Sequence, residues 1–439
     1  MSLNQIKNII EKNSSKKRTG LYSVCSANEL VIRAAIRDAA AHKYTLIIEC
    51  TSNQVNQFGG YTGIRPHEFI AEVQKIAVEE NLPPENLIMG GDHLGPLIWQ
   101  NENEESAMGK AAEMIKAYTL AGFTKIHLDT SMKLAGDPSG PLDPKTCARR
   151  GAVLAKTVYE TFQTMPDKSK RPALVIGSEV PVPGGQKNKN GNDHENGISP
   201  TDADDFLMQV SVFKDEFQKA KLDFNDVVAF VVQPGVEFGD DFVFFYDSEK
   251  ARPLCNALKT MSGFVFEGHS SDYQGAENLS NMVRDGIAIL KVGPALTFAL
   301  REVLFLLEAV EEILIPAKLR SGRNVRSNFK KTLLDVMYDS RQYWEKYYSG
   351  DEDEIRYKML YSYSDRCRYY LPSEKVQASI KTLLNNIPKV PPALLSQYFP
   401  FQYSQYMAGK INNDPLTLIY SYIARICREY AEACSLIQE

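Results

Sequence analysis

The chain has 439 residues, of which 44% are hydrophobic and 24% are charged, and its formal net charge is -5. This composition is typical of a globular protein long enough for one large domain and a smaller one. The mildly acidic balance gives no general electrostatic reason to bind nucleic acid or an anionic membrane, so we expect neither as a partner.

The cysteines and the first residues of the chain indicate the compartment. The 7 cysteines form no CxxC pair and show no secreted-domain spacing, which indicates reduced thiols. Residues 1–18 are polar and basic without the apolar core of a signal peptide. No run approaches the roughly 18 apolar residues that a membrane-spanning helix needs. We therefore expect a cytoplasmic protein.

Short apolar runs alternate with helical stretches along the first two thirds of the chain. The runs lie at 21–26, 45–50, 87–91, 125–129, 173–179, 227–233, 263–267 and 288–292, and helices are predicted at 27–41, 66–81, 104–121, 144–164 and 204–219. Nearly continuous apolar runs are typical of parallel strands buried on both faces, and their alternation with helices predicts repeated crossovers. The sequence therefore predicts an α/β fold, a (β/α)8 TIM barrel, over residues 1–300.

From about residue 301 onward the pattern is helical, with many tyrosines and no strand alternation. We interpret residues 301–439 as an appended C-terminal helical region packed on the barrel. Packing against the barrel is the expected use of its aromatic side chains, and an interface with another protein is the alternative, because tyrosine is enriched at such interfaces.

Polar side chains follow the predicted strands, at the barrel end that carries the chemistry in this fold. The set comprises Asn28, Glu49, Ser52, Asp92, His93, Asp129, Glu179, Gln233, His269, Ser270, Ser271, Asp272, Lys291 and Gly293. Each has an ordinary explanation when taken alone, since polar residues after strands commonly cap the next helix. Lys291 is expected in an ion pair at the barrel rim, with a Schiff-base lysine as the alternative. Together these residues predict a site at the barrel mouth.

Imidazoles and carboxylates within this set predict a divalent metal site. His93, Glu179 and His269 form a mixed nitrogen and oxygen set suited to zinc or manganese, with Asp129 as a fourth ligand or as the partner of a ligand. Asp92, Glu179 and Asp129 are the candidate catalytic carboxylates, and Asp92 follows a glycine pair that lets the backbone turn. The alternative is a plain turn in which Asp92 caps a segment and His93 makes one local hydrogen bond. The other histidines are expected in the core (His127) or at the surface (His42, His67 and His194).

The segments 268–272 and 291–294 follow the last two predicted strands. Loops at these places commonly bind phosphate in this fold, through backbone N–H groups and the amino end of a helix. Ser270, Ser271, Asp272, Lys291 and Gly293 are therefore candidate substrate-binding residues, although helix capping would give the same pattern. The remaining candidates for substrate binding are Asn28, Glu49, Ser52 and Gln233.

Long motifs carry a family resemblance over nearly the whole chain. They lie at 49–63, 90–96, 126–129, 177–185, 232–238, 291–302, 342–348 and 364–366. In these segments the chain resembles the GatZ/KbaZ-type subunits of D-tagatose-1,6-bisphosphate aldolase. The resemblance implies a role in galactitol or N-acetylgalactosamine catabolism, as the partner that stabilises and activates a separate catalytic class II aldolase subunit. Some members are labelled tagatose 6-phosphate kinases, but the sequence has neither a GxxxxGK[ST] loop nor the kinase signatures, so we expect no nucleotide cofactor.

The barrel is also distantly similar to the catalytic class II aldolases. In those enzymes an Asp-His pair after a strand supplies the base and one zinc ligand, and Asp92 with His93 matches that pattern. Their other zinc histidines precede glycines after later strands. Here the segment 236–238 has no histidine, and His269 is offset by one residue. This departure indicates that the chain does not itself cleave the bisphosphate.

Three hypotheses about function follow. The first is a largely non-catalytic subunit that binds and stabilises an aldolase partner. The second is a metal-dependent sugar enzyme in its own right, an aldolase or a ketose or ketohexuronate 4-epimerase, with Asp92 as the proton-transfer group. The third is a barrel that binds a sugar or sugar phosphate and has no protein partner.

Overall fold

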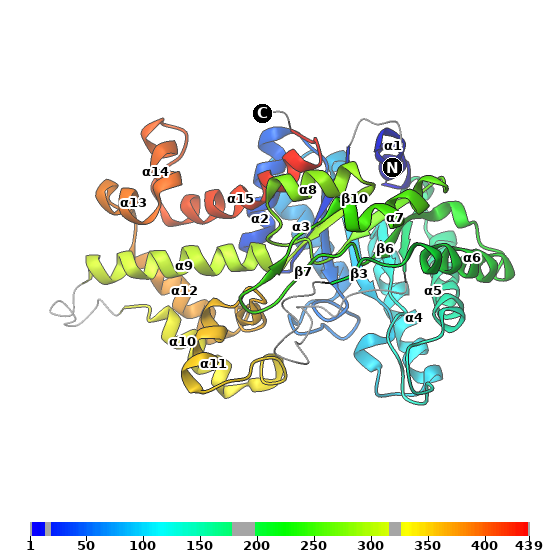
Figure 1. Ribbon diagram of the computed structural model, residues 1–439. Helices are drawn as coiled ribbons and strands as arrows, with labels where there is room; N and C mark the ends of the chain where they lie inside the picture. The colour runs from blue at the N-terminus through cyan, green and yellow to red at the C-terminus, as the bar shows by residue number, and fades with distance from the viewer. Residues whose placement is uncertain (1, 14–18, 178–197, 316–325, 438–439) are drawn as a thin grey trace.

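The computed structural model describes residues 2–13, 19–177, 198–315 and 326–437 (Figure 1). Among these residues, parallel strands close into a barrel in the order β1-β10-β9-β6-β5-β4-β3-β2. The strands are β1 (Leu21–Cys25), β2 (Leu46–Thr51), β3 (Leu87–Leu94), β4 (Lys125–Leu128), β5 (Ala173–Ile176), β6 (Val227–Val232), β9 (Val265–Gly268) and β10 (Ile287–Val292). They coincide with the eight predicted apolar runs, so the prediction of a (β/α)8 barrel is confirmed.

Helices follow the strands and form the outer layer of the barrel (Figure 1). They are α2 (Glu29–His42), α3 (Pro66–Glu79), α4 (Glu104–Ala121), α5 (Pro144–Thr164), α6 (Ala203–Lys219), α7 (Ser248–Lys259), α8 (Gly275–Arg284) and α9 (Pro294–Leu314). Side-chain caps set several starts, because Asn28, Asp143 and Asp202 accept hydrogen bonds from backbone N–H groups in the first turns. A hairpin of β7 (Glu237–Phe238) and β8 (Val243–Phe244) lies between β6 and α7. The sequence did not predict it, because two residues per strand leave no alternation to detect.

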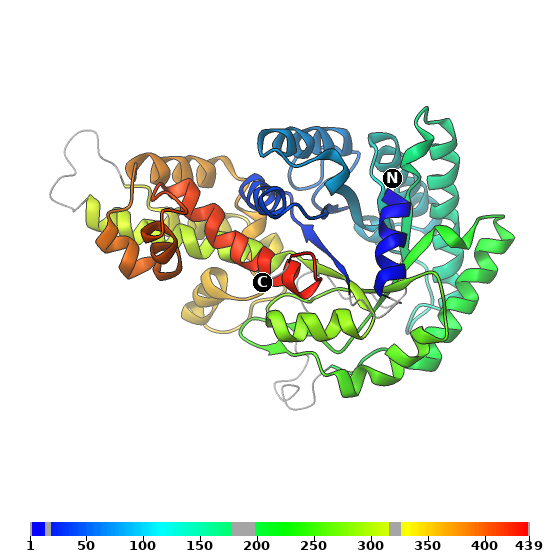
Figure 2. The ribbon, with the colours of Figure 1, turned by 90° about the horizontal axis from the view of Figure 1, so that it is seen from above.

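The amino end of the barrel is closed by α1 (Ser2–Lys12), which packs against β5 and β6. In Figure 2 this helix lies over the barrel, inside the ring of surrounding helices. Leu3, Ile6 and Ile10 share one apolar cluster with strand residues such as Ile47 and Ile289, and all five are buried. The barrel interior is therefore a packed apolar core at this end.

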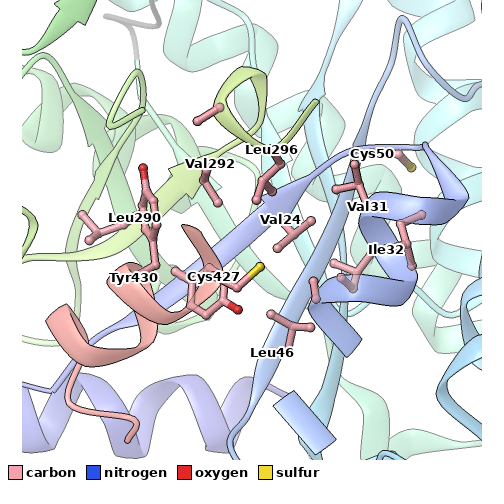
Figure 3. Packing of buried hydrophobic residues seen from close by; sticks show 14 of the residues in the cluster. Val24, Val31, Ile32, Leu46, Cys50, Leu290, Val292, Leu296, Cys427 and Tyr430 are labelled. Atoms are coloured by element: carbon pink, nitrogen blue, oxygen red, sulfur yellow. The ribbon is translucent and has the colours of Figure 1, made fainter. Parts of the chain in front are cut away.

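The C-terminal helices gather at one side of the barrel (Figures 1 and 2). They are α10 (Phe329–Asp339), α11 (Glu352–Tyr361), α12 (Glu374–Asn386), α13 (Pro392–Tyr398), α14 (Pro400–Met407) and α15 (Pro415–Ala433). The last helix, α15, returns to the barrel and packs on α2, α8 and α9. Figure 3 shows its Cys427 and Tyr430 beside Val24, Leu46 and Leu290 of the strands. None of the described helices is long and apolar enough to cross a membrane.

The long helix α9 links the two parts of the chain. It begins directly after β10, as the eighth barrel helix does, and it also packs against α10, α12, α13 and α15. The predicted division at residue 301 falls inside this helix, so one continuous element serves both the barrel and the C-terminal helices.

Candidate functional site

The end of β3 places Asp92 and His93 inside the barrel. Asp92 still pairs with Thr51 of β2, and after a register shift Leu94 pairs with Leu128 of β4. His93 lies at the shift with a φ of 48°, a left-handed conformation that costs energy for a residue other than glycine. The alternative of a plain turn is therefore wrong, because β3 continues through Asp92 and His93 and its irregularity changes the direction of one side chain.

Gly90, the first residue of the glycine pair, makes room inside the barrel. A Cβ at this position would lie 2.5 Å from Cγ of Glu49, the residue paired with it on β2. Gly90 therefore makes room for a buried carboxylate, whereas a Cβ at Gly91 would meet Leu94 and Tyr118.

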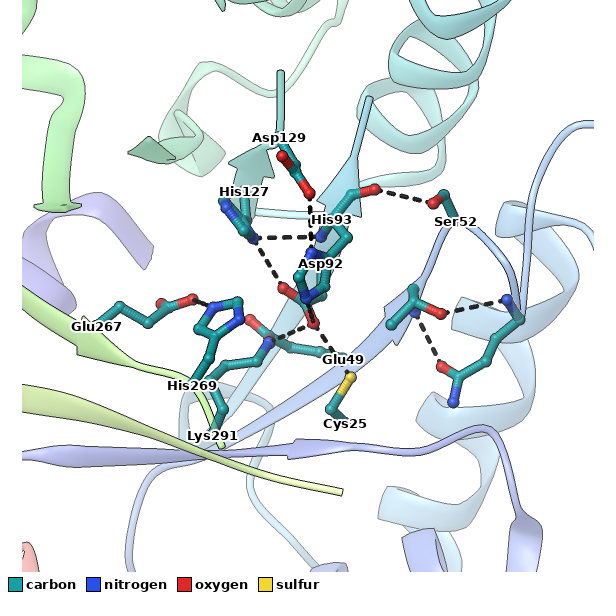
Figure 4. A network of polar contacts seen from close by, with 12 residues as sticks. Cys25, Glu49, Ser52, Asp92, His93, His127, Asp129, Glu267, His269 and Lys291 are labelled. Atoms are coloured by element: carbon teal, nitrogen blue, oxygen red, sulfur yellow. Dashed lines mark hydrogen bonds and ion pairs between the residues drawn. The ribbon is translucent and has the colours of Figure 1, made fainter. Parts of the chain in front are cut away.

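Three imidazoles, those of His93, His127 and His269, meet inside the barrel, each beside a carboxylate (Figure 4). Nδ1 of His93 lies 2.9 Å from Asp129, Nδ1 of His127 lies 2.9 Å from Asp92, and Nε2 of His269 lies 3.1 Å from Glu267. The ring centroids of the three histidines lie 4.9 to 5.2 Å apart. A carboxylate that fixes one ring nitrogen leaves the other nitrogen free to bind a metal ion.

The arrangement can hold a metal ion. Ligand atoms of Asp92, His127, Glu267 and His269 all lie within 4.8 Å of one another, and all four residues are buried. Nε2 of His127 has no hydrogen-bond partner among the described residues. Both contacts of the His127 ring are made by Nδ1, which lies 2.9 Å from Asp92 and 3.2 Å from the backbone nitrogen of His93, so Nε2 is the nitrogen left for a metal ion. Imidazole and carboxylate donors suit zinc or manganese.

This group differs from the predicted metal set. His269 belongs to both, and His93 lies beside the group, but Glu179 falls outside the described residues. Glu267 and His127 were missed. His127 lies in the core, as expected, but its Nε2 has no hydrogen-bond partner among the described residues. The available signal was the period of two along β4, which turns Lys125 and His127 to one face.

A chain of buried ion pairs supports the imidazoles from below. Lys125 lies 2.5 Å from Glu49 and 2.7 Å from Glu267, and Lys291 contacts Glu49 and, at 2.9 Å, Asp92. The side chains of all five are at most 6% exposed. Lys291 is therefore in ion pairs, as the sequence predicted. Glu49 lies beneath the site, where it holds two lysines rather than facing the cavity.

The neighbouring charges shift the pKa values in this cluster. Burial would raise the pKa of Asp92, but the imidazoles around it, His93 first, lower it well below its ordinary value. Burial would lower the pKa of His93, but Asp92 and Asp129 raise it to about 9. Lys125 outweighs the effect of burial on Glu267 and lowers its pKa to about 2, whereas burial lowers the pKa of Lys291 to about 8. The carboxylates are thus held ionised.

A cavity that is open to solvent leads to this cluster. The predicted site residues that line it are Asn28, Asp92, His93, His269, Ser270, Asp272, Lys291 and Gly293. Asn28 also caps α2. Arg368, Tyr369, Leu371 and Pro372 of the C-terminal region line the same cavity, which the sequence did not predict because they lie far from the strands along the chain.

The other predicted site residues make internal contacts. Ser52 donates to the backbone oxygen of His93, and Ser271 donates to that of Lys291. The side-chain oxygen of Gln233 accepts hydrogen bonds from the backbone N–H groups of Gly235 and Val236. These side chains hold the loops around the cavity in place.

The amino end of α9 is occupied by a carboxylate of the chain. Oδ1 of Asp272 accepts hydrogen bonds from the backbone N–H groups of Gly293 (3.0 Å) and Ala295 (2.8 Å). The N–H groups of Leu296 and Thr297 contact the backbone oxygen of Gly293, and Pro294 has none to give. The N–H groups predicted to bind phosphate are thus used internally. Burial raises the pKa of Asp272 to about 6, and these two hydrogen bonds oppose the rise.

Comparisons with known proteins agree with the fold. The family model described as D-tagatose-1,6-bisphosphate aldolase subunit GatZ/KbaZ-like matches residues 6–435. A crystal structure from Sinorhizobium meliloti 1021, described as a probable tagatose 6 phosphate kinase, is 38% identical, with a TM-score of 0.84 over 94% of this chain and 100% of that one.

Two aldolase structures show a much weaker likeness. The YdjI aldolase from Escherichia coli K12 is 10% identical, with a TM-score of 0.40 over 83% of this chain and 95% of that one. A fructose-bisphosphate aldolase from Campylobacter jejuni is 12% identical, with a TM-score of 0.42 over 92% of this chain and 94% of that one. These values are too low to carry an argument about this chain.

Proposed function

The chain belongs to the GatZ/KbaZ-like family of D-tagatose-1,6-bisphosphate aldolase subunits, and from this premise we propose that its barrel binds a divalent metal ion and a ketose. One observation carries the proposal. Three buried imidazoles meet beside an open cavity that His93 and His269 line, each imidazole lies beside a carboxylate, and Nε2 of His127 has no hydrogen-bond partner among the described residues. A subunit that served only as a scaffold would gain nothing from burying these groups, because unpaired polar groups are costly in a protein interior.

The residues divide into ligands and a proton-transfer group. His127 and His269, whose ligand atoms belong to the converging group, are the proposed ligands, with the neighbouring His93 as a third, and a bound zinc or manganese ion would polarise the carbonyl and the adjacent hydroxyl of the sugar. Asp92 faces the same space and is the proposed proton-transfer group. Asp129 and Glu267 orient two of the imidazoles and act as positioning residues. Lys291 holds Asp92 from the other side, 2.9 Å away.

The metal content of the purified protein tests this proposal. The protein is prepared without a chelator or a metal-affinity column, beside His127→Ala, His269→Ala and the exposed control His67→Ala, which lies on α3. We expect near-stoichiometric metal in the wild type and the control, and in the site variants a loss of affinity larger than the roughly 10- to 100-fold that removing a hydrogen-bond partner of a ligand causes. If all four proteins stay free of metal in added zinc and manganese, the proposal is wrong.

The family match also supports a partner. The chain acts, in this proposal, with a separate catalytic class II aldolase subunit, whose lifetime and activity it raises in galactitol or N-acetylgalactosamine catabolism. The kinase description of the Sinorhizobium meliloti protein is not carried over, because the sequence lacks a phosphate-binding kinase loop. Mixing the two purified subunits and following aldol cleavage tests the role. A partner that is stable and fully active alone, and that never co-purifies with this chain, would contradict it.

A metal-dependent enzyme in its own right, a ketose or ketohexuronate 4-epimerase or an aldolase, is the second candidate. The contacts of Asp272 favour it, since they occupy the helix end at which a barrel of this kind commonly binds phosphate. The assay is conversion of ketoses, ketohexuronates and ketose phosphates by this chain alone, beside Asp92→Asn. Turnover that disappears in this variant would establish the second candidate, and no turnover with any sugar would leave the subunit role.

A further inference from the structure

The segment 362–372, between α11 and α12, lies against the barrel mouth. Asp365 accepts hydrogen bonds from Thr297 (2.6 Å) and from Arg301 (3.1 Å), which both belong to α9. Tyr363 is held twice, by Asp240 after the β7 strand and by Tyr273 after β9. These buried contacts with three barrel elements fix the segment in place, so a residue that it presents to the cavity has a defined position.

Arg368 is the charged residue that this segment presents to the cavity. It lies in the short 3-10 helix η8 (Arg366–Tyr369). Its Nη1 donates to the backbone oxygens of Ser364 and Asp365, and its Nη2 donates to the hydroxyl of Tyr369, 3.1 Å away. All three acceptors are uncharged. They orient the guanidinium without neutralising it, and they leave Nε and one hydrogen of Nη2 for another acceptor.

The two cations of the cavity differ in their partners. Lys291 forms ion pairs with Glu49 and Asp92, so its charge is already compensated. No carboxylate among the described residues forms an ion pair with Arg368. Asp365 and Asp272 act on this guanidinium only from beyond ion-pair distance, so it remains available to an anion, and its planar fork matches a phosphate or a carboxylate with two parallel hydrogen bonds.

The other place for an anion is already filled. Asp272 takes the N–H groups at the start of α9, and its own charge repels a second anion there. Across the cavity, Lys291 and the imidazoles are engaged with carboxylates. The anionic end of a ligand is therefore best placed at Arg368, with the rest of the ligand toward the imidazoles.

We infer that Arg368 binds the negatively charged end of an open-chain sugar, the phosphate of a ketose phosphate or the carboxylate of a ketohexuronate. This inference rests on the proposed sugar site and adds the residue of the C-terminal region that selects the substrate. The C-terminal region thereby becomes part of the binding site rather than a separate structural unit.

Calorimetric binding with the full chain tests the inference. The ligands are a ketohexose, its 6-phosphate and the matching ketohexuronate, and the proteins are the wild type, Arg368→Gln, Arg368→Lys and the exposed control Arg356→Gln. We expect wild type and control to bind one or both charged sugars roughly 10- to 100-fold more tightly than the neutral sugar. In Arg368→Gln this preference disappears while the affinity for the neutral sugar stays the same. The lysine variant keeps part of it, and it decides the question if the glutamine variant unfolds.

The outcomes separate this inference from the proposed function. A preference for charged sugars that survives in Arg368→Gln, or a wild type with no such preference, overturns the role of Arg368 and leaves the sugar site intact. A wild type that binds no sugar at all overturns both. The two charged ligands distinguish the sources of the anion, because a phosphate-specific site and a carboxylate-specific site give opposite rankings of the same two sugars.

Discussion

The two ends of the barrel interior are built from the same strands and differ completely in chemistry. At the amino end, Ile6 of α1 belongs to one apolar cluster with Ile47 and Ile289, and all three side chains are buried. At the carboxyl end, Lys125 and Glu49 are equally buried, with side chains 0% exposed. Apolar side chains stabilise the fold independently of one another, whereas buried charges are tolerated only because each compensates its neighbour. The amino end therefore stabilises the fold, and the carboxyl end carries the candidate site.

Removing one charge from the carboxyl end has the largest expected effect. In Lys125→Met, Glu49 loses one of its two lysines and Glu267 loses its only described ion pair with a lysine. We expect a loss of about 3–5 kcal/mol in the free energy of unfolding, because uncompensated charges remain buried. Urea denaturation at pH 7 measures the loss, with Lys116→Met on the exposed face of α4 as the control. A loss below that of the control would mean that the pairs are not coupled.

A truncation at the amino end has the next largest effect. Ile6 is fully buried in the apolar cluster that closes the barrel. Ile6→Ala is expected to cost about 3 kcal/mol, since it leaves a cavity in a packed core. Ile9→Ala, on the partly buried side of α1, is the matched control and should cost less. Metal content and sugar binding should not change. If they fall in Ile6→Ala while the protein remains folded, the two ends are not independent.

The pH dependence of stability tests one residue at the carboxyl end of the barrel, Asp272 in the loop after β9. The pKa of Asp272 is raised to about 6 in the folded protein, above the value of about 3.9 for an unfolded chain. Between these values the folded state binds more protons than the unfolded state, so the contribution of Asp272 to stability falls as the pH rises from 4 to 7.

Asp272→Asn removes this titration and keeps an oxygen acceptor for Gly293 and Ala295. The variant is expected to gain about 2 kcal/mol relative to the wild type between pH 4 and pH 7, by linkage. Denaturant unfolding at several pH values measures the difference. A constant difference between the two proteins across this range would show that the carboxylate is not held at a raised pKa.

The two ends also differ in how far the sequence predicts them. The apolar runs give the strands and the barrel, because parallel strands buried on both faces are hydrophobic at nearly every position. The same rule makes the site hard to predict. Lys125, His127 and Glu267 lie inside strands, where the sequence shows them only as polar residues within apolar runs. The charge partners of these residues come from strands far apart in sequence, and only the closed barrel brings them together.

The C-terminal contribution lies beyond sequence reasoning for a different reason. Arg368 reaches the cavity because Thr297 and Arg301 hold Asp365 on α9, a contact across more than sixty residues of chain. No periodicity records such a contact. Asp272 was recognised as a candidate, but its role could not be predicted. A residue after a strand either caps a helix or binds a ligand, and the sequence pattern is the same in both cases.

The smallest expected effect concerns Cys25, whose thiol also contacts Asp92. Its thiol donates to Oδ2 of Asp92 over 3.3 Å, and burial raises its pKa, so it stays a neutral and weak donor. Cys25→Ala is therefore expected to change the free energy of unfolding by about 0.5 kcal/mol or less, with Cys25→Ser as the variant that keeps a donor. Lys291 remains 2.9 Å from the same oxygen, and His127 remains 2.9 Å from Oδ1 of Asp92. If the alanine variant loses as much stability as Lys125→Met, the carboxyl end depends on each hydrogen bond and not chiefly on its paired charges.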